Sequence, residues 1–296
     1  MKRLLPKVPM MKNTEEDSAP KNKKECLKQA KSKMDAKRCE EEFMKTIQEF
    51  IEEGELVAIK GFMDIYSNDD GSTYFLKLDE DDLNKQFLYF SYIMNAPQAS
   101  AQTGGRPSNG KVLEFRNFKK EKIGLYQINT SYINKNKNNN ISKSSLTNIT
   151  EAFVEVFKPS AKTDNSVLIN VNSILLSEKM DSISFVPSEY REYISVNYGN
   201  QDESKTFVRN VFNNKTNTAF EVTFAYENRM PNINAFSVES VTDPRYLSVT
   251  ARHIFIEMPD DRFEPRVNDH RVGYFVNKST DLTSYDNFPN FALINK

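Results

Sequence analysis

Histidine is the most common zinc ligand in hydrolytic enzymes, and this chain of 296 residues contains only two, His253 and His270. A hydrolytic zinc site needs three protein ligands and an activated water. No His-Glu-x-x-His sequence occurs, so no helix is predicted to place two imidazoles beside a general base. His253 lies in a strand pattern and is expected to be structural. His270 stands near Asp260, Asp261 and Asp269 and is expected in a solvated loop. We therefore expect no tight zinc site in this chain.

Other catalytic or ligand-binding motifs fail at defined positions. Residues Gly105–Lys111 fit the Gly-x4-Gly-Lys start of a phosphate-binding loop, which needs a following Ser or Thr and then a helix. Position 112 is Val and the next residues have a strand pattern, so this segment is predicted to be a flexible loop. The Asp79–Asp82 run lacks calcium-hand spacing and is predicted to be a short acidic helix or turn. We expect no enzymatic activity and no cofactor in this chain.

The most distinctive stretch is a closing segment rich in charge and aromatic residues. It contains Pro265, Arg266, Asp269, Arg271, Val272, Gly273, Tyr274 and Phe275. The two arginines can pair with carboxylates, the glycine permits a tight turn, and the aromatic pair can anchor in an apolar pocket. The segment is thus interpreted either as a brace at the edge of a β domain or as a docking surface for another domain.

The Pro-Arg…Asp-x-Arg-Val-Gly-Tyr-Phe pattern of the closing segment resembles one in a family of large exported bacterial zinc-dependent metalloproteases. A second stretch has a hairpin, an acidic Leu-Asn-Lys turn and the strand Phe87–Ser91 in that order. It resembles the first small domain of the same family. The resemblance implies the non-catalytic N-terminal region of such a protease, which consists of two domains of unknown function. The zinc and the catalytic His-Glu-x-x-His domain of that family have no counterpart here.

Three functional hypotheses are compatible with this resemblance. The first is an accessory module that shields or presents substrate, with a zinc-metalloprotease catalytic domain as its partner. The second is a fragment of an active zinc endopeptidase whose catalytic half is encoded or supplied separately, by truncation or a split gene. The third is a stand-alone binding module on a cell surface. The family implies a periplasmic or cell-surface location, but Pro6 and Lys7 end the apolar run that begins at Met1, so no signal peptide is recognised.

Composition and hydrophobic patterning predict a mainly β, α+β fold with antiparallel sheets, sandwich-like or partly closed, and an amphipathic N-terminal helix. The chain has 38% hydrophobic residues and a net charge of −1, which does not favour nucleic-acid binding. No apolar run reaches the roughly 20 residues of a membrane span. The predicted organisation is a disordered N-terminus (1–20), one amphipathic helix (21–54), a small β-hairpin domain (55–95), a flexible loop (96–110), a β-rich domain (111–258) and a closing segment (259–296) that would lead into a catalytic domain.

The two cysteines, Cys26 and Cys39, both fall inside the predicted helix. Thirteen residues of continuous helix would separate them by roughly 20 Å, which is too far for a disulfide. They are therefore expected to act as small, partly buried hydrophobic side chains.

Overall fold

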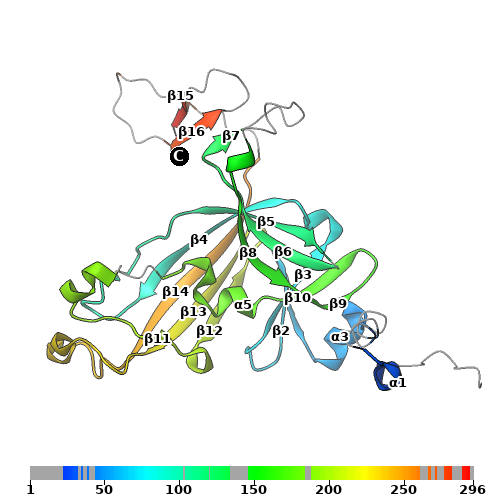
Figure 1. The fold of residues 1–296 in the computed structure, drawn as a ribbon, viewed down its shortest axis with the longest axis horizontal. Helices are drawn as coiled ribbons and strands as arrows, with labels where there is room; N and C mark the ends of the chain where they lie inside the picture. Colours follow the sequence, from blue (N-terminus) through cyan, green and yellow to red (C-terminus); the bar gives the residue numbers. More distant parts are fainter. Residues whose placement is uncertain are drawn as a thin grey trace, which may run out of the picture. The chain divides into compact units, whose positions relative to one another are not determined.

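The fold was determined as a computed structural model, and it consists of two compact units, Met1–Lys45 and Thr46–Lys296. The structure describes residues 23–32, 35, 39, 44–102, 104–119, 121–133, 146–183, 188–260, 266–267, 271, 277–281 and 289–293. The first unit contains helix α1 (Lys23–Gln29). The second unit contains the β-sheets (Figure 1). The predicted disordered segment 1–20 lies outside the described residues.

The second unit is built on two antiparallel sheets. Sheet A has the order β1 (Val57–Ile59), β2 (Asp64–Ser67), β3 (Tyr74–Asp79), β10 (Ser166–Asn170) and β9 (Pro159–Lys162). Sheet B has the order β11 (Asn200–Gln201), β13 (Asn217–Glu227), β14 (Tyr246–Glu257), β4 (Gln86–Asn95), β5 (Lys111–Phe118), β6 (Lys122–Gln127) and β8 (Ala152–Phe157). Strand β12 (Phe207–Asn213) also pairs with β13. The predicted mainly β, antiparallel fold is confirmed.

A third, smaller sheet joins a short strand to the closing segment. Its order is β15 (Arg266–Val267), β17 (Pro289–Leu293), β16 (Asn277–Asp281) and β7 (Tyr132–Ile133). Strands β16 and β7 pair in parallel. The closing segment therefore contributes strands to a sheet in its described part.

Helices are short in the second unit. In its described residues they are α3 (Ile47–Glu53) and α5 (Asn172–Leu175), with the 3₁₀ helices η1 (Glu80–Asp82), η2 (Leu146–Asn148), η3 (Glu178–Met180), η4 (Ser188–Tyr193), η5 (Glu203–Lys205) and η6 (Ile233–Ser237). Helix α3 starts with a capping box, in which the Thr46 hydroxyl accepts from the Glu49 N–H and the Glu49 carboxylate accepts from the Thr46 N–H. The acidic turn predicted at Asp79–Asp82 is confirmed as η1.

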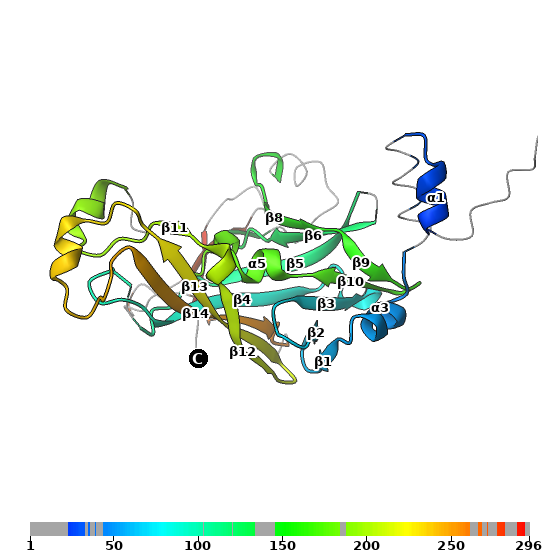
Figure 2. The same cartoon turned by 90° about the horizontal axis from the view of Figure 1, so that it is seen from below.

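Sheet A is covered on both faces, as strand alternation in β3 shows. Tyr74, Leu76 and Leu78 point to one side and belong to the large core shared with sheet B. Phe75 points to the other side and packs with Ile47 of α3 in a second, smaller core. The arrangement of α3, β3 and β10 can be followed in Figure 2. The result is a layered packing of α3, sheet A and sheet B, which fits the sandwich-like architecture expected from the sequence.

The predicted boundary between a hairpin domain (55–95) and a β-rich domain (111–258) is wrong. Strand β4 lies in the first predicted domain, but it is a central strand of sheet B, between β14 and β5. Strands β9 and β10 lie in the second predicted domain, but they extend sheet A beside β3. The chain crosses between the sheets because the apolar faces of both must bury each other in one core.

One asparagine joins the two sheets at the end of β12. The side-chain amide of Asn213 donates to the carbonyls of Ile59 (2.6 Å) and Met63 (2.7 Å), and its carbonyl accepts from the Thr218 hydroxyl at 2.6 Å. Gly61 permits this contact, because a Cβ at that position would lie 2.2 Å from the side-chain oxygen Oδ1 of Asn213. The joint therefore depends on an amide at 213 and on the absence of a side chain at 61.

Replacing Asn213 with alanine is expected to lower the free energy of unfolding by about 2–3 kcal/mol. The substitution leaves two main-chain carbonyls and one hydroxyl without their partner in a partly buried place. Urea unfolding monitored by circular dichroism measures the loss as a shift in midpoint at constant slope. The matched control is Asn214→Ala, which removes one exposed hydrogen bond to Asn217 and should cost under about 1 kcal/mol. Equal losses in the two variants would contradict the role of this joint.

The first unit corrects the prediction of one continuous helix over residues 21–54. Helix α1 ends at Gln29, and residues 30–32 are not helical. The Ser32 hydroxyl accepts from the Asp35 N–H at 3.0 Å and donates to the Asp35 carboxylate at 2.8 Å, as an N-cap does where a new helical turn starts. The helix is thus interrupted between the two cysteines.

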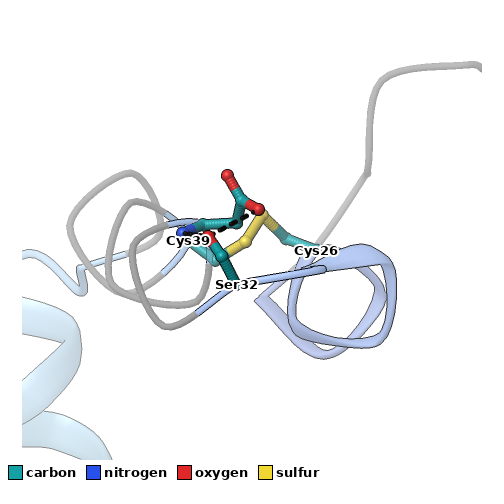
Figure 3. Close-up of a disulfide and its surroundings, with 4 residues drawn as sticks. Cys26, Ser32 and Cys39 are labelled. Carbon is teal, nitrogen blue, oxygen red and sulfur yellow. Dashed lines mark hydrogen bonds between the residues drawn. A yellow bond between two sulfur atoms is a disulfide. The ribbon is translucent and has the colours of Figure 1, made fainter.

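Cys26 and Cys39 form a disulfide, with their Cα atoms 5.6 Å apart (Figure 3). The prediction that they could not pair is wrong, because it assumed an unbroken helix between them. Both cysteines are buried, and the bond closes a loop of the first unit. Loop closure of this kind restricts the unfolded chain and so stabilises the folded unit.

Candidate functional site

A cleft of about 890 Å³ lies at one end of sheet B. Three segments that are distant in sequence form it: the loop after β4, the segment around β11, and the end of β13. The lining residues are Ser100, Gln102, Ile194, Val196, Asn197, Tyr198, Gly199, Asn200, Gln201, Asp202, Glu203, Glu227, Asn228, Arg229 and Met230. The lining is rich in amide and carboxylate side chains, so it presents many hydrogen-bonding groups to a ligand.

Hydrogen bonds fix the three loops to one another. The Val196 N–H donates to the Ala99 carbonyl at 3.1 Å, and the Tyr198 hydroxyl donates to the Ser100 hydroxyl at 2.8 Å. The Asn228 amide donates to the side-chain carbonyl of Asn197 at 3.1 Å. The loops therefore form a connected wall around the cleft rather than three independent segments.

Behind the cleft, the buried Tyr226 packs against Tyr198, a partly buried residue of the lining. The rings of Tyr198 and Tyr226 have centroids 5.0 Å apart, and the Tyr226 hydroxyl donates to the Glu178 carboxylate at 2.8 Å. Burial raises the pKa of Tyr198 to about 12, and burial and the carboxylate of Glu178 raise the pKa of Tyr226. Burial also raises the pKa of Glu178. Both phenols therefore keep their protons at neutral pH and act as hydrogen-bond donors.

Gly199, in the cleft lining, lies close to the main chain at the end of β13. A Cβ at this position would lie 1.9 Å from the carbonyl oxygen of Glu227 and 2.5 Å from the Cα of Asn228. The next two residues, Asn200 and Gln201, form β11 and pair with Glu227 and Tyr226. Only glycine therefore allows the chain to enter β11 this close to β13.

The cleft has more negative than positive groups. Asp202, Glu203 and Glu227 line it together with a single cation, Arg229. Arg229 lies 3.1 Å from the Glu227 carboxylate, and its side chain is 89% exposed, so this pair is weak. A hydrogen bond from Lys205, which lies outside the lining, holds the pKa of Asp202 below its usual value, so this carboxylate stays ionised. The cleft should favour neutral or cationic groups.

Large apolar side chains stand exposed beside the cleft. Met230 lines the cleft and is 88% exposed, Ile233 is 82% exposed and Tyr193 is 79% exposed. Tyr190 and Phe236 are also exposed. They belong to η4, η6 and the residue run between β13 and η6, which lie at the end of sheet B where β11 lies, at the left of Figures 1 and 2. Exposed apolar groups gathered on fixed loops are typical of a binding surface.

His253 lies in β14 as predicted, but it is fully buried in the core. Its Nδ1 lies 2.8 Å from the hydroxyl of Tyr89, and it pairs with Ser91 of β4 across the sheet. Burial raises the pKa of Tyr89, so the phenol keeps its proton at neutral pH and can donate to Nδ1 or accept from it, according to the imidazole tautomer. Burial, together with the charge of Lys111, lowers the pKa of His253 to about 3, so the ring is neutral in the folded protein. The position fits a structural role.

The predicted docking residues are only partly described. Arg266 lies in β15, and Arg271 lies in an exposed turn. The other six, Pro265, Asp269, Val272, Gly273, Tyr274 and Phe275, lie outside the described residues, as does His270. The docking role thus stays a prediction.

The predicted loop at 105–111 leads into strand β5 and not into a helix, as expected. It folds back on β4, since Ser108 and Ser91 exchange two hydrogen bonds that involve their main-chain N–H groups. Among the described residues, no three His, Cys, Asp or Glu side chains gather in a group that suits a metal ion.

Sequence reasoning missed the cleft. The signal that was present is the apolar content of turn-rich segments, because Met230, Ile233 and Phe236 stand in a link with no strand or helix period. Such residues are unusual in a solvated loop unless they bind something. The polar residues of the cleft gave no comparable signal, since amides and acids are ordinary in loops.

Comparison with known proteins gives one family. The family described as "Domain of unknown function (DUF5117)" matches residues 105–290, which run from the loop before β5 into β17. No curated protein matches, and no solved structure matches. Within the described residues, no helix is long and apolar enough to cross a bilayer. Since the match covers more than half of the chain, this protein belongs to the DUF5117 family.

Proposed function

We propose that this chain is a non-catalytic accessory module that binds unfolded polypeptide and presents it to a zinc-dependent metalloprotease-like catalytic domain. The observation that carries the proposal is the loop end of sheet B, where a polar cleft adjoins exposed apolar side chains. An unfolded polypeptide suits both parts of this surface. Its main chain can form hydrogen bonds with the polar side chains of the cleft, and its apolar side chains can be buried against the exposed apolar residues.

Two features of the apolar surface favour polypeptide over a small ligand. Met230, Ile233 and Tyr193 are almost fully exposed, although a folded protein gains by burying such side chains. Methionine adapts to partners of different shape and is common on surfaces that bind many sequences. The loops beneath these side chains are held by hydrogen bonds, so the surface is largely formed before a ligand arrives.

The link to a metalloprotease is supported by the sequence resemblance of the closing segment and of the hairpin-to-strand segment. The disulfide between Cys26 and Cys39 supports an exported protein, because disulfides persist in oxidising compartments such as the periplasm or cell surface. In this proposal the module supplies binding and the catalytic domain supplies the zinc. We expect the isolated chain to cleave no peptide bond, with or without added zinc.

The binding function is tested with reduced, carboxyamidomethylated lysozyme, an unfolded and basic polypeptide, by fluorescence anisotropy. We expect saturable binding to this chain. The triple variant Tyr193→Ser, Met230→Ser, Ile233→Ser should bind at least tenfold more weakly, because it removes three exposed apolar contacts. The matched control is Val57→Ser in β1, which is also exposed but lies away from the cleft lining. Absence of binding by the unaltered chain, or equal binding by the triple variant, would contradict the proposal.

A further inference from the structure

The edge of sheet B beside the cleft is formed by β11, which is paired on one side only in the described part of the chain. The register of β11 on β13 determines which N–H and C=O groups of β11 are hydrogen-bonded to β13. The Asp202 N–H donates to the Ala225 carbonyl at 2.8 Å, so Asp202 and Ala225 are a hydrogen-bonded pair of the antiparallel ladder. Such pairs alternate with pairs that exchange no main-chain hydrogen bond.

Gln201 faces Tyr226 in this ladder, and these two residues therefore form a pair without main-chain hydrogen bonds between them. The N–H and C=O of Gln201 therefore point away from β13, and Gln201 is one of the residues that line the cleft. The Gln201 side chain is occupied elsewhere, since its amide donates to the Leu176 carbonyl at 2.6 Å. One donor and one acceptor of the main chain are thus presented at a fixed spacing to whatever enters the cleft.

An extended peptide satisfies this pair of groups. A residue of a strand placed opposite Gln201 accepts from its N–H and donates to its carbonyl, as in the addition of a peptide strand to a sheet edge. Strand β11 is short, with two residues, and the chain turns away into η5 just after it. The short edge therefore limits strand addition to one short stretch of peptide.

The carboxylates of the cleft lining favour a positively charged side chain in such a peptide. Asp202, Glu203 and Glu227 surround β11 in sequence or in the ladder. Lys205 pairs with Asp202 at 2.6 Å and the exposed Arg229 pairs weakly with Glu227, so the carboxylates outnumber these two cations by one. Alternate side chains of a strand point to opposite sides. A strand in the cleft can therefore direct a cationic side chain to the carboxylates and an apolar neighbour toward the exposed side chain of Met230.

We infer that the cleft binds an extended peptide by strand addition to the free edge of β11, with a lysine or arginine of the peptide directed to Asp202, Glu203 and Glu227. This inference rests on the proposed polypeptide-binding function and specifies its mode and its charge preference.

The test uses a fluorescein-labelled twelve-residue peptide of alternating valine and lysine. Two analogues carry N-methyl groups, one on every valine and the other on every lysine. N-methylation blocks the hydrogen bonds of one edge of an extended strand and leaves the other edge intact. We expect one analogue to bind at least tenfold more weakly than the parent, and the other to bind within about threefold of it. Replacing every lysine of the parent with glutamate should weaken binding by more than tenfold.

Protein variants locate the peptide. Gln201→Pro removes the outward N–H, while the matched control Gln201→Ala removes the same side chain and keeps that N–H. We expect Gln201→Pro to bind the valine-lysine peptide at least tenfold more weakly than Gln201→Ala. Circular dichroism checks that both variants are folded, and the outcome of the N-methyl series does not depend on either variant.

The outcomes separate the inference from the proposed function. If the unaltered chain binds unfolded lysozyme but both N-methylated analogues bind equally well, strand addition is wrong and the polypeptide-binding function stands. If Gln201→Pro has no more effect than Gln201→Ala, the peptide lies elsewhere and the inference is likewise overturned. If neither lysozyme nor the valine-lysine peptide binds, both the inference and the proposed function fail.

Discussion

Replacing Gly199 with alanine is expected to weaken binding of the valine-lysine peptide by at least thirtyfold. The new Cβ would lie 1.9 Å from the Glu227 carbonyl oxygen and 2.5 Å from the Asn228 Cα, and both are main-chain atoms that cannot rotate away. The overlap can be relieved only if β11 moves away from β13. Strand β11 has two residues in the ladder, and each main-chain hydrogen bond contributes only about 1 kcal/mol net, so detachment costs less than the overlap.

The same change should leave the rest of the fold nearly intact. The large core does not depend on β11, because the buried side chains of β13 pack against β14 and sheet A. We expect the free energy of unfolding to fall by no more than about 2–3 kcal/mol, the cost of local overpacking. Hydrogen exchange of the main-chain amides of β11 should increase strongly, while exchange in β14 stays slow.

Gly110→Ala is the matched control for this glycine. A Cβ at Gly110 would meet nothing within 4 Å, and the residue lies in the loop before β5. The control should bind the peptide like the unaltered chain and keep slow exchange in β11. Wild-type affinity in Gly199→Ala would show that the close approach of β11 to β13 does not shape the cleft.

The protein is expected to lose stability in mild acid because of His253. Its pKa is about 6.5 in an unfolded chain and is lowered to about 3 in the folded protein, mainly by burial. The unfolded state therefore binds a proton that the folded state excludes over this range. The contribution of the neutral His253 side chain to the free energy of unfolding is complete above pH 6.5 and is lost as the pH falls from 6.5 toward 3. The loss should reach about 2 kcal/mol by pH 5 and about 4–5 kcal/mol near pH 3.

Urea unfolding at a series of pH values measures this effect. His253→Gln removes the titrating group, so we expect a lower stability at pH 7 but a nearly flat profile from pH 6.5 to pH 5. Most carboxylates titrate below this window, which makes it specific for histidine. The matched control is His270→Gln, which removes the other histidine of the chain and should keep the acid-dependent loss.

Glu178 contributes to the pH profile with the opposite sign. Burial raises its pKa in the folded protein, so the folded state takes up this proton more readily than the unfolded state, and acid favours folding through this group. The difference between the unaltered chain and His253→Gln cancels this contribution, because both proteins retain Glu178. If the difference in free energy of unfolding between the unaltered chain and His253→Gln is the same at pH 6.5 and pH 5, the burial of a neutral imidazole at His253 is contradicted.

Local pattern was enough to predict several elements of this protein. The strand pattern around His253 is confirmed as β14, Tyr246–Glu257, because a run of alternating apolar side chains favours a strand. The hairpin before β4, the acidic turn at Asp79–Asp82 and the strand after Gly110 were also predictable, because turn residues and period act over a few positions. The β-rich class followed from the frequency of such strands.

Contacts between distant residues were beyond the reach of local pattern. The break at residues 30–32 allowed a disulfide that a continuous helix forbids, and helical periodicity did not reveal it. The pattern of β14 indicated a strand, but whether His253 lies at an edge or in the centre depends on which strands flank it. The joint at Asn213 connects residues more than 150 positions apart, and nothing near 213 indicates it.

The amino-acid sequence by itself determined the class of fold, most strands near the centre of sheet B, and the absence of a local zinc-hydrolase motif. The tertiary structure alone decided the exchange of strands between the sheets, the buried neutral histidine and the cleft. The cleft gathers Ser100, Asn197 and Arg229 from three loops that share no local signal. The physical reason is that side-chain period reports one face of one element, whereas a site depends on which elements bury each other and on where their connecting loops must then meet.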